Sequence, residues 1–323
     1  MSESAASAPR RFAFSPRRRR DRAGDAVLRV VTAAAALLVL VTVGLLGYEL
    51  VKQSWRAISE FGLGFVTSRA WDPVRADFGA LDFIYGTVYC SLLAVLVAAP
   101  AATAIALFLS ELAPRGVRTV IGTLVELLAA IPSVVIGLWG IFVLGPFVQT
   151  HLGPFLSRWL GFLPFFKGTP QLTGYLPAVI VLTIMILPIT ASVARELFLT
   201  VPRDLKEASY ALGATRWEMI RGVVLPQTRG GLVAAIMLGL GRAVGEAIAV
   251  TQVIGGTLGI HLSLFKNGDT LASRIAAQYQ AAATNIHISS LVYLALVLLV
   301  FSLITNIVAQ VIVRRFERQL EGR

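Results

Sequence analysis

Six long apolar runs, separated by shorter polar segments, dominate the sequence. Most reach the roughly 20 residues that an α-helix needs to cross the hydrocarbon core of a bilayer. The first run is too long for the core of a signal peptide, and no small-x-small cleavage site follows it. The pattern therefore predicts an all-α integral membrane protein with six transmembrane helices, at residues 30–46, 84–109, 117–147, 176–197, 230–254 and 288–313.

Three of the runs contain a proline away from their ends, at Pro100, Pro132 and Pro188. A membrane helix tolerates proline where neighbouring groups satisfy the freed backbone carbonyl, so we expect kinks inside a helix bundle. The segmentation predicts three parts of the chain. These are a disordered basic cytoplasmic tail (1–25), a first transmembrane helix with an external loop (26–83), and a core of five transmembrane helices (84–318) that includes a cytoplasmic loop at 198–229.

Composition supports a membrane protein over a soluble one. Hydrophobic residues make up 56% of the chain, charged residues only 15%, and the formal net charge is +11. Such a positive charge can indicate nucleic-acid binding, but here the basic residues lie in short flanks between the apolar runs, which is typical of cytoplasmic membrane loops. We therefore expect a lipid bilayer around the chain and no nucleic-acid partner. The one cysteine, Cys90, can form no intrachain disulfide.

The distribution of Lys and Arg predicts the orientation. Twenty of the 29 lie in the two terminal segments and in the loops after the second and fourth runs, and eight lie in the other loops. Loops rich in Lys and Arg stay in the cytoplasm. The bias predicts a multi-pass protein of the plasma or inner membrane with both termini and the 198–229 loop in the cytoplasm, which requires an even number of spans.

The 198–229 loop begins with a short helix-forming segment. Pro202 suits the start of a helix and Gly213 is placed to stop it about three turns later. The small side chains between them suit close entry into a groove of another protein. The loop resembles the EAA motif of ABC-importer permeases, E-A-A-x3-G-x9-I-x-L-P, and agrees with it in every spacing. The matching positions are Glu207, Ala208, Ser209, Gly213, Val223, Leu225 and Pro226. Two of them depart from the motif, since Ser209 stands for Ala and Val223 for Ile.

Four further stretches of the sequence indicate which subgroup of ABC-importer permeases the chain resembles. FGALDFIYGTVYCSLLA, LVELLAAIPSVVIGLWGIFVLGP, MILPITASVARE and GLGRAVGEAIAVTQVIGG are similar to PstC-type permeases of phosphate-specific ABC importers. The match runs from about Phe61 to the C-terminus, and only the basic N-terminal tail has no counterpart. The related PstA-type permeases share the GRAxGE segment, whereas IPSVVIGLWG and AVTQVIGG favour the PstC side.

The resemblance implies a type I ABC importer permease fold, in which residues 84–318 form the permease core and the 198–229 loop carries a coupling helix that docks on a separate ATPase. The alternative is a plain amphipathic helix at the membrane surface. On the docking interpretation the ATPase-coupling residues are Arg203, Glu207, Ala208, Ser209, Gly213, Leu225 and Pro226.

Two charged residues lie inside the fifth apolar run. Arg242 is 12 residues into it, about 18 Å from its cytoplasmic start and so near the bilayer centre. A charge there costs at least about 3 kcal/mol and marks a functional site by default. Glu246 follows four residues later, which places it on the same face of a continuous helix.

Two interpretations of these charges remain open. They form an internal ion pair that locks helix packing, or Arg242 receives an oxyanion in the substrate pathway through its bidentate guanidinium. In the second case Glu246 either holds Arg242 so that the anion binds only transiently, or accepts a hydrogen bond from the P–OH of phosphate, which sulfate lacks. The family resemblance implicates both residues in transport.

Smaller side chains complete the predicted pathway. Ser133, Thr190 and Thr251 are candidates to line it, although hydroxyls in membrane helices usually bond to their own backbone. Gly241 and Gly245 form a GxxxG pair, which lets helices approach closely. Their packing partner is equally well another helix of this chain or a partner permease.

Motifs for independent chemistry are absent from the sequence. No G-x-x-x-x-G-K-[ST] loop occurs, so the chain is not an ATP-hydrolysing enzyme of that class and a partner subunit must supply the energy. Its three histidines are scattered and no HExxH motif or cysteine cluster accompanies them, so we expect no metal site. We likewise expect no cofactor.

The favoured function is that of a permease subunit of an ATP-driven phosphate importer. The expected partners are a PstA-like permease in a heterodimer, an ATPase dimer, an external phosphate-binding protein and phosphate itself. Alternatives are a permease for another oxyanion such as molybdate or sulfate, and a proton-coupled secondary transporter or passive channel. A membrane-anchored signalling protein would leave the intramembrane charges unexplained.

Overall fold

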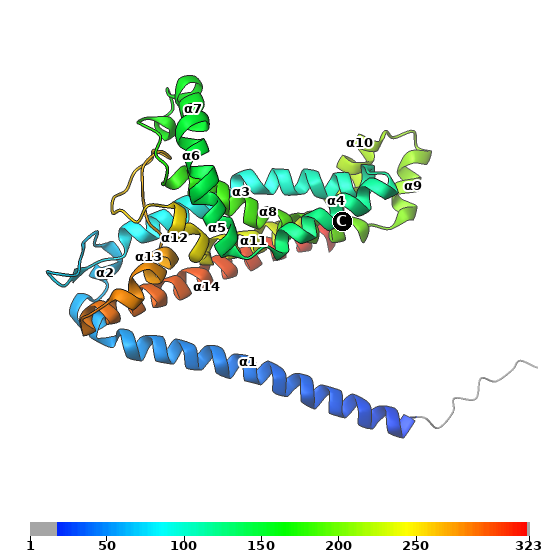
Figure 1. Ribbon diagram of the computed structural model, residues 1–323. Helices are drawn as coiled ribbons and strands as arrows, with labels where there is room; N and C mark the ends of the chain where they lie inside the picture. Colours follow the sequence, from blue (N-terminus) through cyan, green and yellow to red (C-terminus); the bar gives the residue numbers. More distant parts are fainter. Residues whose placement is uncertain (1–17, 322–323) are drawn as a thin grey trace, which may run out of the picture. The chain divides into compact units, whose positions relative to one another are not determined.

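A computed structural model describes the backbone of residues 18–321 and the side chains of residues 24–315. The chain is almost entirely helical (Figure 1). Its helices are α1 (Arg18–Phe61), α2 (Gly64–Thr67), α3 (Leu81–Leu107), α4 (Arg115–Ala130), α5 (Ser133–Trp139), α6 (Gly145–Phe147), α7 (Gly153–Leu160), α8 (Tyr175–Leu199), α9 (Arg203–Ala211), α10 (Arg216–Met219), α11 (Leu225–Gly245), α12 (Ile248–Val253), α13 (Leu271–Gln278) and α14 (Asn285–Glu321).

Short elements join these helices. Strands β1 (Trp71–Asp72) and β2 (Asp77–Phe78) pair antiparallel, with Trp71 opposite Phe78. Four π-helical turns extend neighbouring α-helices: η1 (Phe108–Leu112), η2 (Gly140–Leu144), η3 (Val148–Leu152) and η5 (Ile220–Val224). Two 3₁₀ turns are η4 (Pro164–Phe166) and η6 (Tyr279–Ala281).

The chain divides into two compact units, Met1–Glu49 and Leu50–Arg323. In the first unit the described part is the beginning of α1. The predicted disordered tail at residues 1–25 falls mostly on residues 1–17, which lie outside the described residues, and the backbone is helical from Arg18.

Six helical segments of the described chain are long and apolar enough to cross a membrane, as the sequence predicted. They are Gly24–Phe61, Leu81–Leu112, Ser133–Leu160, Tyr175–Leu199, Arg216–Gly245 and Asn285–Arg315. Pro100 and Pro188 lie inside α3 and α8, which continue through them. The protein is therefore a multi-pass, all-α membrane protein.

The third predicted span, at residues 117–147, is wrong in its extent because it contains a complete break. Helix α4 ends at Ala130, Ile131 is extended (ψ 127°) and α5 begins at Ser133. Pro132 has no N–H to donate, and it disfavours helical dihedrals at the residue before it. The segment long and apolar enough to span is Ser133–Leu160, while α4 is a separate helix with Gly122 as its one buried residue.

The core of the second unit forms where α3, α8 and α11 pack together. Small residues of α3, such as Ala94 and Ala98, are fully buried beside Leu182 and Met185 of α8. Close approach between α8 and α11 requires glycine at two positions, because a Cβ at Gly239 would lie 2.6 Å from Thr190 Oγ1 and one at Gly231 would lie 2.8 Å from Leu197 Cδ2.

Helices α5 and α12 are in similarly close contact. A Cβ on Gly137 would lie 2.8 Å from Ala249 Cα and 2.8 Å from Gln252 Oε1, and one on Gly140 would lie 2.7 Å from Val253 Cγ1. The IPSVVIGLWG and AVTQVIGG segments of the sequence are thus the two sides of one helix contact. This contact fixes the position of α12 against α5. Helix α12 is also the element that follows α11 in the chain.

Replacement of Gly137 by valine is expected to destabilise the protein by about 1–3 kcal/mol, the usual cost of overpacking. The new side chain would have to displace the backbone of α12 at Ala249. Thermal unfolding of the purified chain, followed by light scattering or fluorescence, measures the change. Gly116→Val is the matched control, because a Cβ there meets no atom within 4 Å. Equal melting temperatures for the two variants would contradict the close packing.

Candidate functional site

One side of α11 is left uncovered by the other described residues of the second unit. Its exposed residues follow the helical repeat through the apolar part of the helix, and they are Ala234, Leu238, Gly241, Arg242 and Gly245. We call these five residues the open stripe. A surface that contains a guanidinium and two glycines in a membrane helix is suited to protein or water and poorly suited to lipid.

The two glycines of the open stripe have no packing partner among the described residues. A Cβ built on Gly241 or Gly245 meets no atom within 4 Å. The described residues thus supply no intrachain contact for the GxxxG pair, and packing against a partner permease stays a prediction. Gly231 and Gly239 make the intrachain contacts instead, and sequence reasoning missed them because a glycine's spacing does not say which face of a helix is covered.

Arg242 and Glu246 do not share a helical face, which corrects the sequence-based expectation. Helix α11 ends at Gly245, and Glu246 adopts an extended conformation (φ −72°, ψ 118°) before α12 begins at Ile248. Glycine weakens the helix at this point, and the carboxylate offers an alternative interaction: Glu246 Oε1 accepts a hydrogen bond from the Ala249 amide at 3.2 Å. The fifth span is thus a discontinuous helix, a feature that membrane proteins tolerate where it is buried in protein or lines a cavity.

Each charge is stabilised by a different helix end. Arg242 lies in the last turn of α11, where the helix dipole favours a cation, and Glu246 lies beside the N-terminus of α12, where the dipole favours an anion. Arg242 has neither an ion pair nor a hydrogen bond with any residue that the structure describes. Its exposed guanidinium is consequently available to an anion or to a partner carboxylate.

The three hydroxyl residues predicted to line the pathway occupy different environments. Ser133 is half-buried and is the first residue of α5. Thr190 is 2% exposed and faces Gly239 in the α8–α11 contact. Thr251 Oγ1 donates to the carbonyl of Ala247 in its own helix at 2.7 Å. None of these contacts decides whether the residues meet a substrate, so their role stays a prediction.

The predicted coupling segment forms a short exposed helix. Helix α9 follows Pro202 and has no buried residue. Gly213 ends it with a left-handed backbone (φ +87°), and its amide donates to the carbonyl of Tyr210 at 2.9 Å. The backbone hydrogen bonds and dihedrals thus agree with the helix limits expected from Pro202 and Gly213.

The predicted docking residues are accessible on this helix. Arg203, Glu207 and Ala208 are exposed, and Ser209 is half-buried. Leu212 is 90% exposed at the end of the helix. Leu225 and Pro226 are half-buried and form the first turn of α11, so the coupling segment leads directly into the helix that carries the open stripe.

A half-buried ion pair connects α9 to the turn η1 that follows α3. Lys206 Nζ lies 2.6 Å from Glu111 Oε1 in the turn η1, and the two side chains are only 15% and 9% exposed. Lys206 Nζ also donates to the carbonyl of Phe198 near the end of α8, at 3.4 Å. Below the pair lies a buried apolar cluster of Ala106, Ala194, Phe198, Val201, Met219, Ile220 and Val224. Sequence reasoning missed this pair, because 95 residues separate its members.

A second ion pair lies between the fifth and sixth spans. Arg274 Nη2 is 2.7 Å from Asp269 Oδ2 and donates to the carbonyl of Gly256 at 3.0 Å. Its guanidinium also lies over the ring of Phe83, 4.9 Å from the centroid. Burial raises the pKa of Asp269 above its ordinary value, although the charge of Arg274 and the hydrogen bond from the Ser273 hydroxyl oppose this shift. The pair connects Asp269, in the loop before α13, to Arg274 within that helix, and Arg274 Nε is buried without a hydrogen-bond partner among the described residues. No group of three His, Cys, Asp or Glu in the described part of the chain could hold a metal.

Residues 100–318 match the protein family described as the binding-protein-dependent transport system inner membrane component. The chain is 44% identical over 297 residues to the phosphate transport system permease protein PstC of Mesorhizobium japonicum, covering 91% of each chain. It is 41% identical to the PstC of Pasteurella multocida, covering 93% of this chain and 94% of that one.

Solved structures share the fold at lower identity. An inward-facing chain of the MetNI methionine ABC transporter aligns with a TM-score of 0.54 and 21% identity, covering 72% of this chain and 94% of that one. A chain of a bacterial ABC transporter involved in import of the acidic polysaccharide alginate aligns with a TM-score of 0.58 and 19% identity, covering 90% and 97%. The fold is that of the type I ABC importer permeases.

Proposed function

Because the chain belongs to the binding-protein-dependent transport inner membrane components, and among them to the PstC permeases, we propose that it forms half of the translocation pathway of an ATP-driven importer of inorganic phosphate. It is a transport subunit, and ATP is hydrolysed by a partner. The observation that carries the proposal is the exposed guanidinium of Arg242, unpaired among the described residues and situated within a spanning helix of a PstC relative.

The substrate contact is Arg242. A guanidinium stays protonated and donates two parallel N–H bonds to phosphate oxygens, so it can replace part of the hydration shell of the anion. Glu246 keeps one carboxylate oxygen engaged with α12 and has one left for a P–OH donor. This second contact would favour phosphate over sulfate, which has no such proton at neutral pH.

The partner permease, of PstA type, covers the open stripe. Gly241 and Gly245 let its helix approach closely, and Arg242 then faces a path between the two subunits instead of lipid. Two ATPase subunits and an external phosphate-binding protein complete the importer. Both termini and the coupling segment lie in the cytoplasm, as the excess of Lys and Arg in those segments indicates.

Coupling runs through α9. Closure of the ATPase dimer around ATP displaces α9, which is tied to α3 by the Lys206–Glu111 pair and leads through η5 into α11. Movement of these helices opens the pathway outward to accept phosphate from the binding protein. Phosphate then passes Arg242 and leaves inward when the nucleotide is spent.

Co-purification and nucleotide hydrolysis test this function. We expect the chain to co-purify with an ATPase and a second permease, and the purified complex to hydrolyse ATP faster when the phosphate-loaded binding protein is added. Reconstituted vesicles should then accumulate labelled phosphate only with ATP. Uptake that persists without nucleotide and follows a proton gradient would contradict an ATP-driven importer. Competition by molybdate or sulfate at equal concentration would indicate a different oxyanion.

A further inference from the structure

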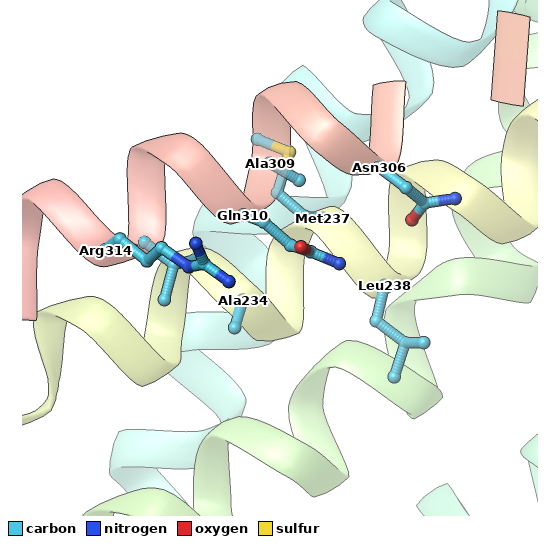
Figure 2. A pocket seen from close by; sticks show the side chains of 8 residues that line it. Ala234, Met237, Leu238, Asn306, Ala309, Gln310 and Arg314 are labelled. Carbon is cyan, nitrogen blue, oxygen red and sulfur yellow. The ribbon is translucent and has the colours of Figure 1, made fainter. Parts of the chain in front are cut away.

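A groove runs between α11 and α14, and two residues of the open stripe, Ala234 and Leu238, line it. It has a volume of about 370 Å³. Figure 2 shows that its walls come from these two helices alone. The lining residues are Ala234, Met237 and Leu238 of α11, and Asn306, Ala309, Gln310, Val313 and Arg314 of α14.

The α14 wall carries a row of polar side chains. Asn306, Gln310 and Arg314 are spaced four residues apart, which places them along one side of the helix, and all three are exposed. In Figure 2 the guanidinium of Arg314 extends toward the amide of Gln310. None of the described lining residues is acidic, so the groove offers amide and guanidinium donors without a carboxylate that would repel an anion.

Polar side chains are costly on a membrane helix unless they face protein or water. The adjacent exposed surface of α14 is apolar, with Leu303, Ile307 and Val311 each 49–59% exposed. The apolar side chains form a surface suited to lipid, and the polar row lies beside that surface on the same helix. The polar row therefore marks the side of α14 that faces an aqueous route.

The groove leads toward Arg242. Figure 2 shows Leu238 at the end of the groove that holds Asn306, and Ala234 nearer the Arg314 end. Arg242 follows Leu238 by one turn of α11 on the same exposed side. The order along the route is thus Arg242, Asn306, Gln310 and then Arg314, which precedes the C-terminal end of α14.

We propose that this groove is the inward exit route for phosphate, between Arg242 and the cytoplasm. The inference rests on the proposed function, since it takes Arg242 as the preceding contact. Gln310 donates amide N–H groups to phosphate oxygens as the anion leaves Arg242, and Asn306 donates the N–H that its amide does not give to the Ser302 carbonyl. Arg314 supplies a positive potential at the mouth, which draws the anion out of the span.

Reactivity of introduced cysteines in the complete importer tests the route. N306C and Q310C are compared with I307C and V311C, which lie on the neighbouring apolar surface. The native Cys90 is buried, so the unaltered chain gives the background rate. The probes are the membrane-impermeant sulfonatoethyl and trimethylammonioethyl methanethiosulfonates, applied to inverted vesicles.

We expect N306C and Q310C to react at least about tenfold faster than the two controls, and inorganic phosphate to slow them in the absence of nucleotide. The anionic probe should react faster than the cationic one, and R314Q added to either variant should remove that preference. Equal rates for all four cysteines, or reactivity that neither phosphate nor another oxyanion slows, would overturn the exit route.

The outcomes distinguish a failure of the proposed exit route from a failure of the proposed function. Reactive cysteines that are protected by another oxyanion but not by phosphate would keep the groove and refute phosphate as the substrate. ATP-dependent phosphate uptake by a complex whose N306C variant stays unreactive would keep the function and refute the groove.

Discussion

Replacement of Arg242 by glutamine is expected to lower ATP-dependent phosphate uptake by at least about 100-fold while the importer stays assembled. A 100-fold loss corresponds to about 3 kcal/mol, and it is expected because the entering anion would no longer meet an opposite charge in the last turn of α11. Arg242 makes no hydrogen bond or ion pair with the described residues, so its removal leaves no buried partner unsatisfied within this chain.

Uptake of labelled phosphate into vesicles measures the effect, and co-purification of all subunits measures assembly. Arg75→Gln is the matched control, because the Arg75 side chain is 85% exposed and its ion pair with Asp72 is a surface pair of little energetic value. Arg242→Lys should retain intermediate uptake, since lysine keeps the charge and loses the bidentate geometry. Normal uptake by Arg242→Gln would exclude Arg242 from the pathway.

Replacement of Lys206 by methionine is expected to separate ATP hydrolysis from phosphate uptake. The variant leaves Glu111, whose side chain is 9% exposed, without its cation, and because the pair is half-buried we expect a cost below the roughly 3–5 kcal/mol of a fully buried pair. Helix α9 would still present Glu207 and Ala208 to the ATPase but would no longer be anchored to the end of α3. We expect the complex to hydrolyse ATP at a rate that the loaded binding protein no longer stimulates, with uptake reduced at least about tenfold.

A charge reversal distinguishes an anchoring role from simple instability. K206E combined with E111K should recover part of the stimulated hydrolysis that either single variant loses. Glu126→Gln is the matched control, because Glu126 is 67% exposed and lies 3.8 Å from Arg195, so its loss should change little. If Lys206→Met retained full stimulation and uptake, the pair would not transmit movement of α9.

Local signals allowed the sequence to predict the coupling helix closely. Pro202 fixes a backbone angle suited to a helix start, and Gly213 adopts the positive φ that most other residues avoid, so both ends of α9 were expected where they occur. The six spans were predicted for an equally simple reason. Runs of apolar residues of that length have no other stable environment than a bilayer or a large core.

The breaks in the helices could not be predicted in the same way. Pro100 and Pro188 lie within continuous helices, whereas Pro132 separates α4 from α5. The residue type is identical in all three cases, so the difference depends on whether surrounding groups satisfy the freed carbonyls. The end of α11 at Gly245 is likewise followed by a hydrogen bond that the Ala249 amide donates to the Glu246 carboxylate, and no periodic pattern indicates it.

Contacts between residues that lie far apart in the sequence could not be predicted either. Lys206 appeared as one basic residue in a basic loop and Glu111 as one acidic residue in a short turn. Their pairing becomes visible only when α3 and α9 meet. The face of α11 that is covered, with Gly231 and Gly239, and the face that is open, with Gly241 and Gly245, required the fold for the same reason.

The open stripe has a consequence for how cells must make this protein. A copy synthesised without its companion would hold a guanidinium and bare glycine backbone against acyl chains. Such a copy is poorly suited to remain alone in lipid. Synthesis of the partner permease at the same time and in equal amount would limit how long the stripe faces acyl chains.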